Sequence, residues 1–124
     1  MRVQLEADSV LVEIELNETS TARQIWEALP FESQANTWGE EIYFSIPVHR
    51  DQEKPQEVVQ AGDVAYWPPG RALCLFFGPT PVSAPGEIRP YSPVTVVGKI
   101  AGDLQVLKNI KEGEKVRLRQ VSSE

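Results

Sequence analysis

The stretch GDVAYWPPGRALCLFFG, residues 62–78, determines how this chain is expected to fold. It contains two apolar and aromatic runs, residues 64–67 and 72–77, which have the length and composition of buried β-strands. Between them, the two adjacent prolines cannot donate hydrogen bonds to a sheet, and Gly70 can adopt a positive φ angle. We therefore predict a β-hairpin that turns at Trp-Pro-Pro-Gly, with trans peptide bonds before both prolines.

Alternation of apolar and polar residues continues on both sides of this hairpin and predicts six further strands. Four of them alternate clearly and have one apolar face, as expected of strands that cover a core, whereas residues 94–100 are a largely apolar run and residues 57–60 could form a brief edge strand. In the third of these strands, Ile42, Phe44, Ile46 and Val48 form that face. The six predicted strands lie at residues 3–7, 10–16, 40–48, 57–60, 94–100 and 115–121.

Two short amphipathic helices are predicted between the strands. In the first, Thr21 and Gln24 have the spacing of a capping box, Pro30 ends the apolar pattern, and Trp26 is expected to pack into the core. The second helix begins after Asp103 as its N-cap. Many short antiparallel strands must cover their edges, and closure into a barrel does so. The pattern therefore predicts a mainly β fold: a closed, eight-stranded antiparallel barrel with two short capping helices.

Two segments are expected to be irregular. Residues 36–39 should form a turn that carries Trp38. Residues 79–93 contain five prolines and few apolar residues, which predicts a long surface loop. Loops of this length within a compact domain are often functional.

Length and charge restrict the possible functions. A chain of 124 residues predicts a single domain spanning residues 1–124. The net charge of -6 argues against binding to nucleic acid and against a polybasic membrane contact. The first residues lack the pattern of a signal peptide, and no apolar run approaches the ~20 residues that cross a bilayer. We therefore expect a cytoplasmic protein without membrane or nucleic-acid partners.

The order of predicted elements resembles the cyclophilin fold, an eight-stranded barrel closed by two helices. The run VTVVGKIAGDLQVLKNI, residues 94–110, is similar to the strand-Gly-Lys-helix segment of cyclophilins, and LCLFFG, residues 73–78, to the strand that carries part of their isomerase groove. NTWGEEIYF, residues 36–44, together with residues 62–78, resembles a narrower family of small prokaryotic cyclophilin-like domains of unknown function. This resemblance covers essentially the whole chain and implies the fold, but it implies no activity.

The same resemblance indicates that the prolyl-isomerase residues of cyclophilins are largely absent here. Their arginine belongs to the strand that in this chain offers Glu40 and Glu41 and no arginine. A carboxylate cannot polarise the prolyl nitrogen as a guanidinium donor does. Leu75 stands near the position of their glutamine and Phe77 near that of their phenylalanine, while their tryptophan and histidine before the strand at Val94 have no counterpart.

The sequence also indicates no other catalytic residues, no metal site and no cofactor. Glu40 and Glu41 are consecutive strand residues that point to opposite faces, so they cannot form an acid/base pair. His49 and Cys74 are single, which leaves too few ligands for a usual zinc site. We expect Cys74 to be a small buried apolar residue. Glu41 beside Tyr43 could bind a cation or a donor group, but a solvated strand entrance is the interpretation we prefer.

A group of aromatic and polar residues remains as a candidate ligand groove. Either these side chains are structural, or they form an apolar groove with a few orienting polar groups. Arg71 and Arg89 could supply the cationic side chain that the strand at residues 40–48 lacks. The candidate residues are Trp38, Glu41, Tyr43, Tyr66, Trp67, Arg71, Phe77 and Arg89.

Three functions are compatible with this group. The main hypothesis is a non-enzymatic binding module that holds a peptide or small ligand near Tyr43, Trp67 and Phe77. The alternative is an enzyme, either a weak prolyl isomerase that uses Arg71 or Arg89, or a carboxylate-dependent activity at Glu41. In a third interpretation, the surface aromatics bind a partner protein.

Overall fold

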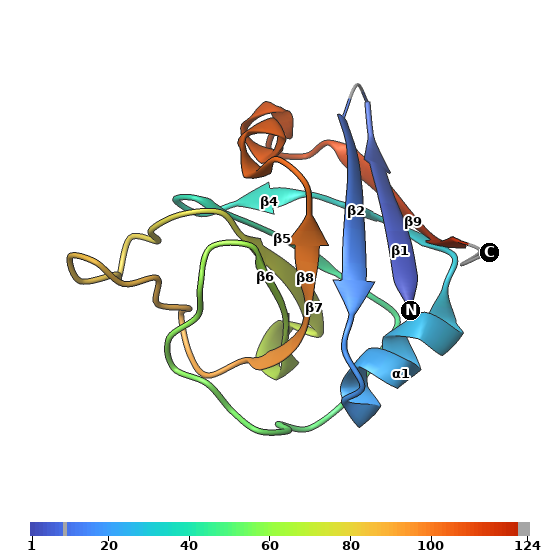
Figure 1. Cartoon of the computed structure of the whole chain (residues 1–124), viewed down its shortest axis with the longest axis horizontal. Coiled ribbons are helices and arrows are strands. Elements are labelled where there is room, and N and C mark those ends of the chain that lie inside the picture. Colours follow the sequence, from blue (N-terminus) through green and yellow to red (C-terminus); the bar gives the residue numbers. More distant parts are fainter. Residues whose placement is uncertain (9, 122–124) are drawn as a thin grey trace.

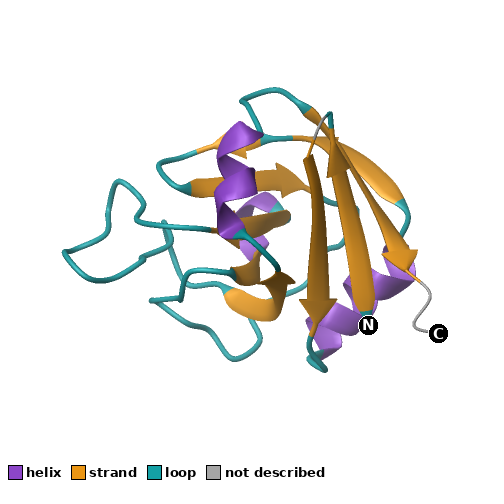
Figure 2. Cartoon of the chain, turned by 45° about the horizontal axis from the view of Figure 1, so that its top comes forward, coloured by secondary structure: helices purple, strands orange, loops and turns teal. Residues whose placement is uncertain are grey.

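The computed structural model of the chain describes residues 1–8 and 10–121. Within these residues, antiparallel strands curl into a nearly closed barrel that carries one α-helix and two 3-10 helices (Figure 1, Figure 2). The helices are α1 (Ser20–Ala28), η1 (Pro68–Gly70) and η2 (Leu104–Asn109). The strands are β1 (Arg2–Ala7), β2 (Val10–Leu16), β3 (Phe31–Gln34), β4 (Asn36–Thr37), β5 (Glu41–Ser45), β6 (Asp63–Trp67), β7 (Ala72–Phe76), β8 (Thr95–Ala101) and β9 (Lys115–Val121).

The sheet order is β3-β9-β1-β2-β8-β6-β7-β5-β4, so its two end strands are consecutive along the chain. Only Ala35 separates β3 from β4. Its N–H donates to the carbonyl of Glu114 over 2.8 Å, and its carbonyl accepts from the N–H of Gly113 over 2.7 Å. The chain therefore changes partners at Ala35, from β9 to β5, and brings the two ends of the sheet together.

The observed strand count and closure differ from the prediction. Eight strands in a closed barrel were expected, whereas the described residues form nine strands in a nearly closed barrel. Two observed strands, β3 and β4, were not predicted, and one predicted strand does not form. In β3, Phe31 is the one apolar residue, so no alternation of polarity marks the strand. Asn36 and Thr37 belong to β4 and not to the predicted turn. The predicted strand at residues 57–60 is reduced to one isolated bridge, which pairs Val59 with Ile88.

The hairpin of β6 and β7 forms as predicted, but its turn uses a different residue. Val64 pairs with Leu75, and both prolines follow trans bonds, the cis X-Pro bond being at Leu29–Pro30. The left-handed residue is Arg71, with φ 47°, and not Gly70. A Cβ atom on Gly70 would lie 2.6 Å from the Trp67 ring, so glycine is required here for space.

Both predicted helices form; the first differs from the prediction at its start and the second in its type. The N-cap of α1 is Thr19 and not Thr21, because the Thr19 hydroxyl accepts from the N–H of Ala22. Thr21 is buried, and its N–H and hydroxyl donate to Glu53. These hydrogen bonds lower the pKa of Glu53 to about 2 and attach the loop after β5 to the helix. The second helix is a 3-10 helix, with Asp103 as its N-cap as expected.

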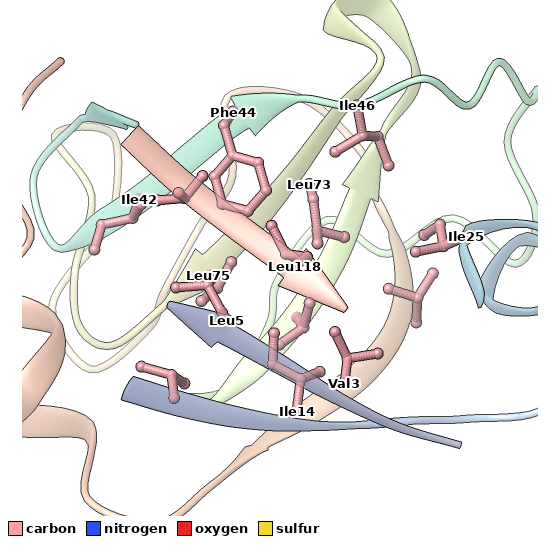
Figure 3. Close-up of a cluster of buried hydrophobic side chains, with 14 of the residues drawn as sticks. Val3, Leu5, Ile14, Ile25, Ile42, Phe44, Ile46, Leu73, Leu75 and Leu118 are labelled. Carbon is pink, nitrogen blue, oxygen red and sulfur yellow. The ribbon is translucent and has the colours of Figure 1, made fainter. Parts of the chain in front are cut away.

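Apolar side chains from both halves of the barrel fill its interior (Figure 3). Ile25 of α1 covers one end of this cluster, while Trp26 is only partly buried against it. Tyr66 lies inside with a fully buried side chain, and its hydroxyl donates to the carbonyl of Val48 over 2.6 Å. The largest apolar members are Leu5, Ile14, Ile42, Phe44, Leu73, Leu75, Leu107 and Leu118.

A second, smaller apolar cluster lies on the outer face of β6 and β7. It forms because β-strand side chains alternate between faces, so that these strands are buried on both sides. Ile88, from the loop between β7 and β8, packs against it, as is usual for satellite clusters under long loops. Its buried members are Val59, Ala65, Ala72, Cys74, Phe76 and Val94.

The described residues include no helix with the length and apolar character that crossing a membrane requires.

Because its hydroxyl is buried, Tyr66 is expected to contribute to stability through two hydrogen bonds: it donates to the carbonyl of Val48 and accepts from the N–H of Arg50. Replacing it by phenylalanine leaves the carbonyl of Val48 without this donor and the N–H of Arg50 without this acceptor, which should lower the free energy of unfolding by about 1–3 kcal/mol. Urea denaturation measures this change. The control is Tyr91→Phe, since Tyr91 is 72% exposed and should lose little stability. Equal losses of unfolding free energy in the two variants would contradict a stabilising role for the Tyr66 hydroxyl.

Candidate functional site

A pocket of about 180 Å³ opens on the outer face of the barrel, where residues 79–93 leave the wall (yellow in Figure 1). The wall contributes side chains from β5, β6 and β7 and from the turn that precedes β5. The loop before β8 contributes the remainder. The lining residues are Trp38, Glu41, Tyr43, Trp67, Cys74, Pro90, Tyr91 and Val94.

Strand register explains why the wall residues gather. Tyr43 of β5 is paired with Cys74 of β7, which is in turn paired with Ala65 of β6. Paired residues lie on the same face of a sheet, so the small side chains of Cys74 and Ala65 form a floor between larger ones. Tyr43 and Trp67 rise on either side of this floor, from the two strands that flank β7.

The loop is held over this floor by aromatic and polar contacts. The ring of Tyr91 meets Trp38 and Trp67 edge to face, with centroid distances of 6.0 and 5.9 Å. The Trp67 indole N–H also donates to the Ser92 hydroxyl over 2.7 Å. Further along, the Ser83 hydroxyl accepts from the N–H groups of two loop residues, Thr80 and Arg89. The loop therefore has a defined conformation without regular secondary structure.

Glu41 is buried in this pocket, which corrects the expectation of a solvated strand entrance. Its side chain is only 5% exposed, because the turn bearing Trp38 folds back on β5 through backbone hydrogen bonds between Trp38 and Glu41. Among the described residues, its carboxyl group forms no salt bridge. Burial raises the pKa of Glu41 to about 7, and a hydrogen bond with the Cys74 thiol offsets part of this rise.

Cys74 is a buried residue, as expected, but it also lines the pocket. Burial raises the pKa of its thiol well above the usual value, and the neighbouring Glu41 raises it further. The thiol is therefore protonated at neutral pH and is a weak nucleophile. Within residues 1–8 and 10–121, no group of three His, Cys, Asp or Glu side chains is placed to bind a metal ion.

The structure brings only part of the predicted groove together. Trp38, Glu41, Tyr43 and Trp67 line the pocket, whereas the other four candidates do not. Tyr66 points into the barrel and Phe77 packs against the interior cluster. Arg71 is exposed at the hairpin turn, and the Arg89 guanidinium is bonded to Glu87 over 2.8 Å.

The sequence analysis did not assign Cys74, Pro90, Tyr91 and Val94 to the site. Three of these come from the end of the proline-rich loop and the residue that follows it. The length and proline content of that loop were the available signal, but they do not show which residue reaches the barrel. Strand pairing was needed to place Cys74 beside Tyr43.

The barrel fold and a match to a family model define the class of protein to which the chain belongs. The chain belongs to the Cyclophilin-like family, whose model matches residues 1–119. This confirms the resemblance inferred from residues 36–44 and 62–78.

A particular protein with the same fold is the hypothetical protein AF2241 from Archaeoglobus fulgidus. Its solution structure matches with a TM-score of 0.84 and 45% sequence identity, over 98% of this chain and 95% of that one. No significant similarity to a curated protein was found.

The buried Glu41 carboxyl should make stability fall as the pH rises. Its pKa is about 7 in the folded chain and 4.5 ordinarily, so between these values the unfolded chain releases a proton that the folded chain keeps. Stability is therefore full below about pH 4.5 and decreases until about pH 7, by about 3 kcal/mol in total. Glu41→Gln should remove this decrease and exceed the wild type in stability at pH 8.

Urea denaturation between pH 4.5 and pH 8 measures this difference. The matched control is Glu40→Gln, the neighbouring glutamate, which is not among the residues that line the pocket. Its pH dependence should follow that of the wild type. Parallel curves for the wild type and Glu41→Gln would show that Glu41 ionises as readily as an exposed carboxyl.

Proposed function

We propose that this chain is a binding module whose outer pocket holds a small ligand or a single side chain of a peptide. The observation that carries the proposal is the arrangement of four aromatic residues around one buried carboxyl group on the barrel wall. Binding sites for small molecules are typically concave and apolar, with a few placed polar groups. A partner protein would use the same pocket by inserting one residue.

The size of the pocket limits what it can enclose. Its volume of about 180 Å³ is below the range of roughly 300–1,000 Å³ usual for drug-sized ligands. It suits a compact chemical group and not an extended peptide. The hydrogen bonds and ring contacts that hold the loop also favour binding, because a preformed site loses less conformational entropy when the ligand enters.

Prolyl isomerisation finds no support in the geometry. No arginine lines the pocket: Arg71 is exposed at the hairpin turn, and Arg89 is paired with Glu87. Leu75, near the position of the cyclophilin glutamine, is fully buried inside the barrel and cannot reach a ligand on the outer face. The described residues thus place no cationic donor where a prolyl carbonyl or nitrogen would lie in this pocket.

Ligand binding should be visible on the tryptophans. In a ¹H–¹⁵N NMR titration with a set of small neutral, basic and acidic fragments, the indole N–H signals of Trp38 and Trp67 should shift. That of Trp26 should not, because it packs against the interior cluster. Tyr91→Ala should weaken binding at least ~10-fold by removing the ring that contacts both indoles.

Leu11→Ala is the control for this variant. Leu11 is also well exposed, at 58%, but lies on β2 outside the pocket, so affinity should not change. Failure of every fragment to shift Trp38 or Trp67 would overturn the proposed function. So would shifts that are insensitive to the Tyr91 substitution.

A peptide containing an Xaa-Pro bond tests the isomerase alternative. We expect no acceleration of its cis/trans exchange, measured by exchange NMR, because no cationic donor lines the pocket. The variant with both Arg71 and Arg89 replaced by alanine should behave as the wild type does. Acceleration that disappears in this double variant would restore the isomerase interpretation.

A further inference from the structure

Building on the proposed function, we propose that the pocket selects ligands that carry a compact alkylammonium group. The cation would lie among the rings of Trp38, Trp67 and Tyr91 and against the carboxylate of Glu41.

The first support is the arrangement of the rings. Tyr91 packs edge to face against both Trp38 and Trp67, and Tyr43 lines the same pocket. An aromatic face attracts a cation within roughly 6 Å of the ring centroid, and several faces together form the cages that bind quaternary ammonium groups. The four rings here line one pocket of about 180 Å³, which has room for a compact cation beside them.

The second support is charge complementarity. Glu41 supplies the one carboxyl group among the lining residues, and these include no lysine, arginine or histidine. The other ionisable groups that line the pocket are the Cys74 thiol of β7 and the phenols of Tyr43 and Tyr91. None of these provides a positive charge, so a bound cation would be the ionic partner that Glu41 lacks within the described chain.

The same features disfavour the other ligand classes. An anionic ligand would meet the charge of Glu41 with no cationic side chain to offset it. A neutral ligand would fill the pocket and leave the ionised carboxylate more deeply buried and still unpaired, which is unfavourable. A cation would pair with the buried charge of Glu41 and contact the aromatic rings at the same time.

The test compares choline with 3,3-dimethyl-1-butanol, which has the same shape but carries carbon in place of the charged nitrogen. Each is titrated into the full chain at pH 8, and the indole signals of Trp38 and Trp67 are followed by NMR. Choline should bind at least ~10-fold more tightly than the alcohol. Glu41→Gln should lower choline affinity toward that of the alcohol and should not weaken binding of the alcohol, because the variant places no unpaired charge beneath it.

Lowering the pH provides an independent readout. Protonation of Glu41 removes the partner of the cation, so choline affinity should fall between pH 8 and pH 6, while that of the alcohol should not fall. Glu40→Gln, the adjacent glutamate outside the lining, should retain the choline affinity and pH dependence of the wild type.

The outcomes separate this inference from the proposed function. Equal affinities for choline and the alcohol would overturn the cation preference and still support a binding pocket. The same conclusion would follow if neither probe bound while another fragment shifted Trp38 and Trp67. Choline binding that survives Glu41→Gln unchanged would also overturn the inference. If no fragment of any class shifted these tryptophans, the pocket itself would lose its assigned role.

Discussion

The alternation of side chains across β6 and β7, both of whose faces are buried, is the constraint on which the rest of the structure depends. One face of this wall completes the barrel interior through residues such as Tyr66 and Leu75. The other carries Cys74 and Trp67 beneath the long loop. Because a one-residue shift in register would exchange these faces, the pairing that builds the core also positions the pocket.

Glu41 shows how a local cost to stability accompanies the site. Its carboxyl group is buried beside aromatic rings and a thiol, without a positive partner among the described residues. An apolar residue at this position would suit a purely structural wall better. Groups of this kind occur mainly where a protein uses them, and the position of Glu41 on the surface of a pocket agrees with that principle.

The parts of the fold that sequence could predict are those with strong local signals. The hairpin of β6 and β7 has apolar runs and an obligatory turn, and Asp103 is a typical N-cap. In contrast, β3 is a mostly polar edge of the sheet, and its pairing depends on a change of partner at Ala35 that no local pattern indicates. The sequence also could not show that Tyr66 faces the barrel interior and Trp67 the outer face, because a strand buried on both faces has no alternation of polarity.

The site was harder to predict, since it depends on contacts between distant segments. Trp38, Glu41, Tyr43 and Trp67 stood out by residue type, but the burial of Glu41 follows from the turn and the loop that cover it. Tyr91 became part of the site only through its two ring contacts. Residue types in the sequence indicated candidate side chains, but only the folded structure shows which of them lie in contact.

The division of the pocket between wall and loop has an evolutionary consequence. Tyr91 lines the pocket, is largely exposed and belongs to neither apolar cluster, so substitutions there alter the shape and chemistry of the pocket at little cost to the barrel. Wall residues such as Cys74 are constrained by packing on the same strand that holds the core. Chains that share this barrel can therefore diverge in what they recognise by exchanging a single loop, while their fold remains the same.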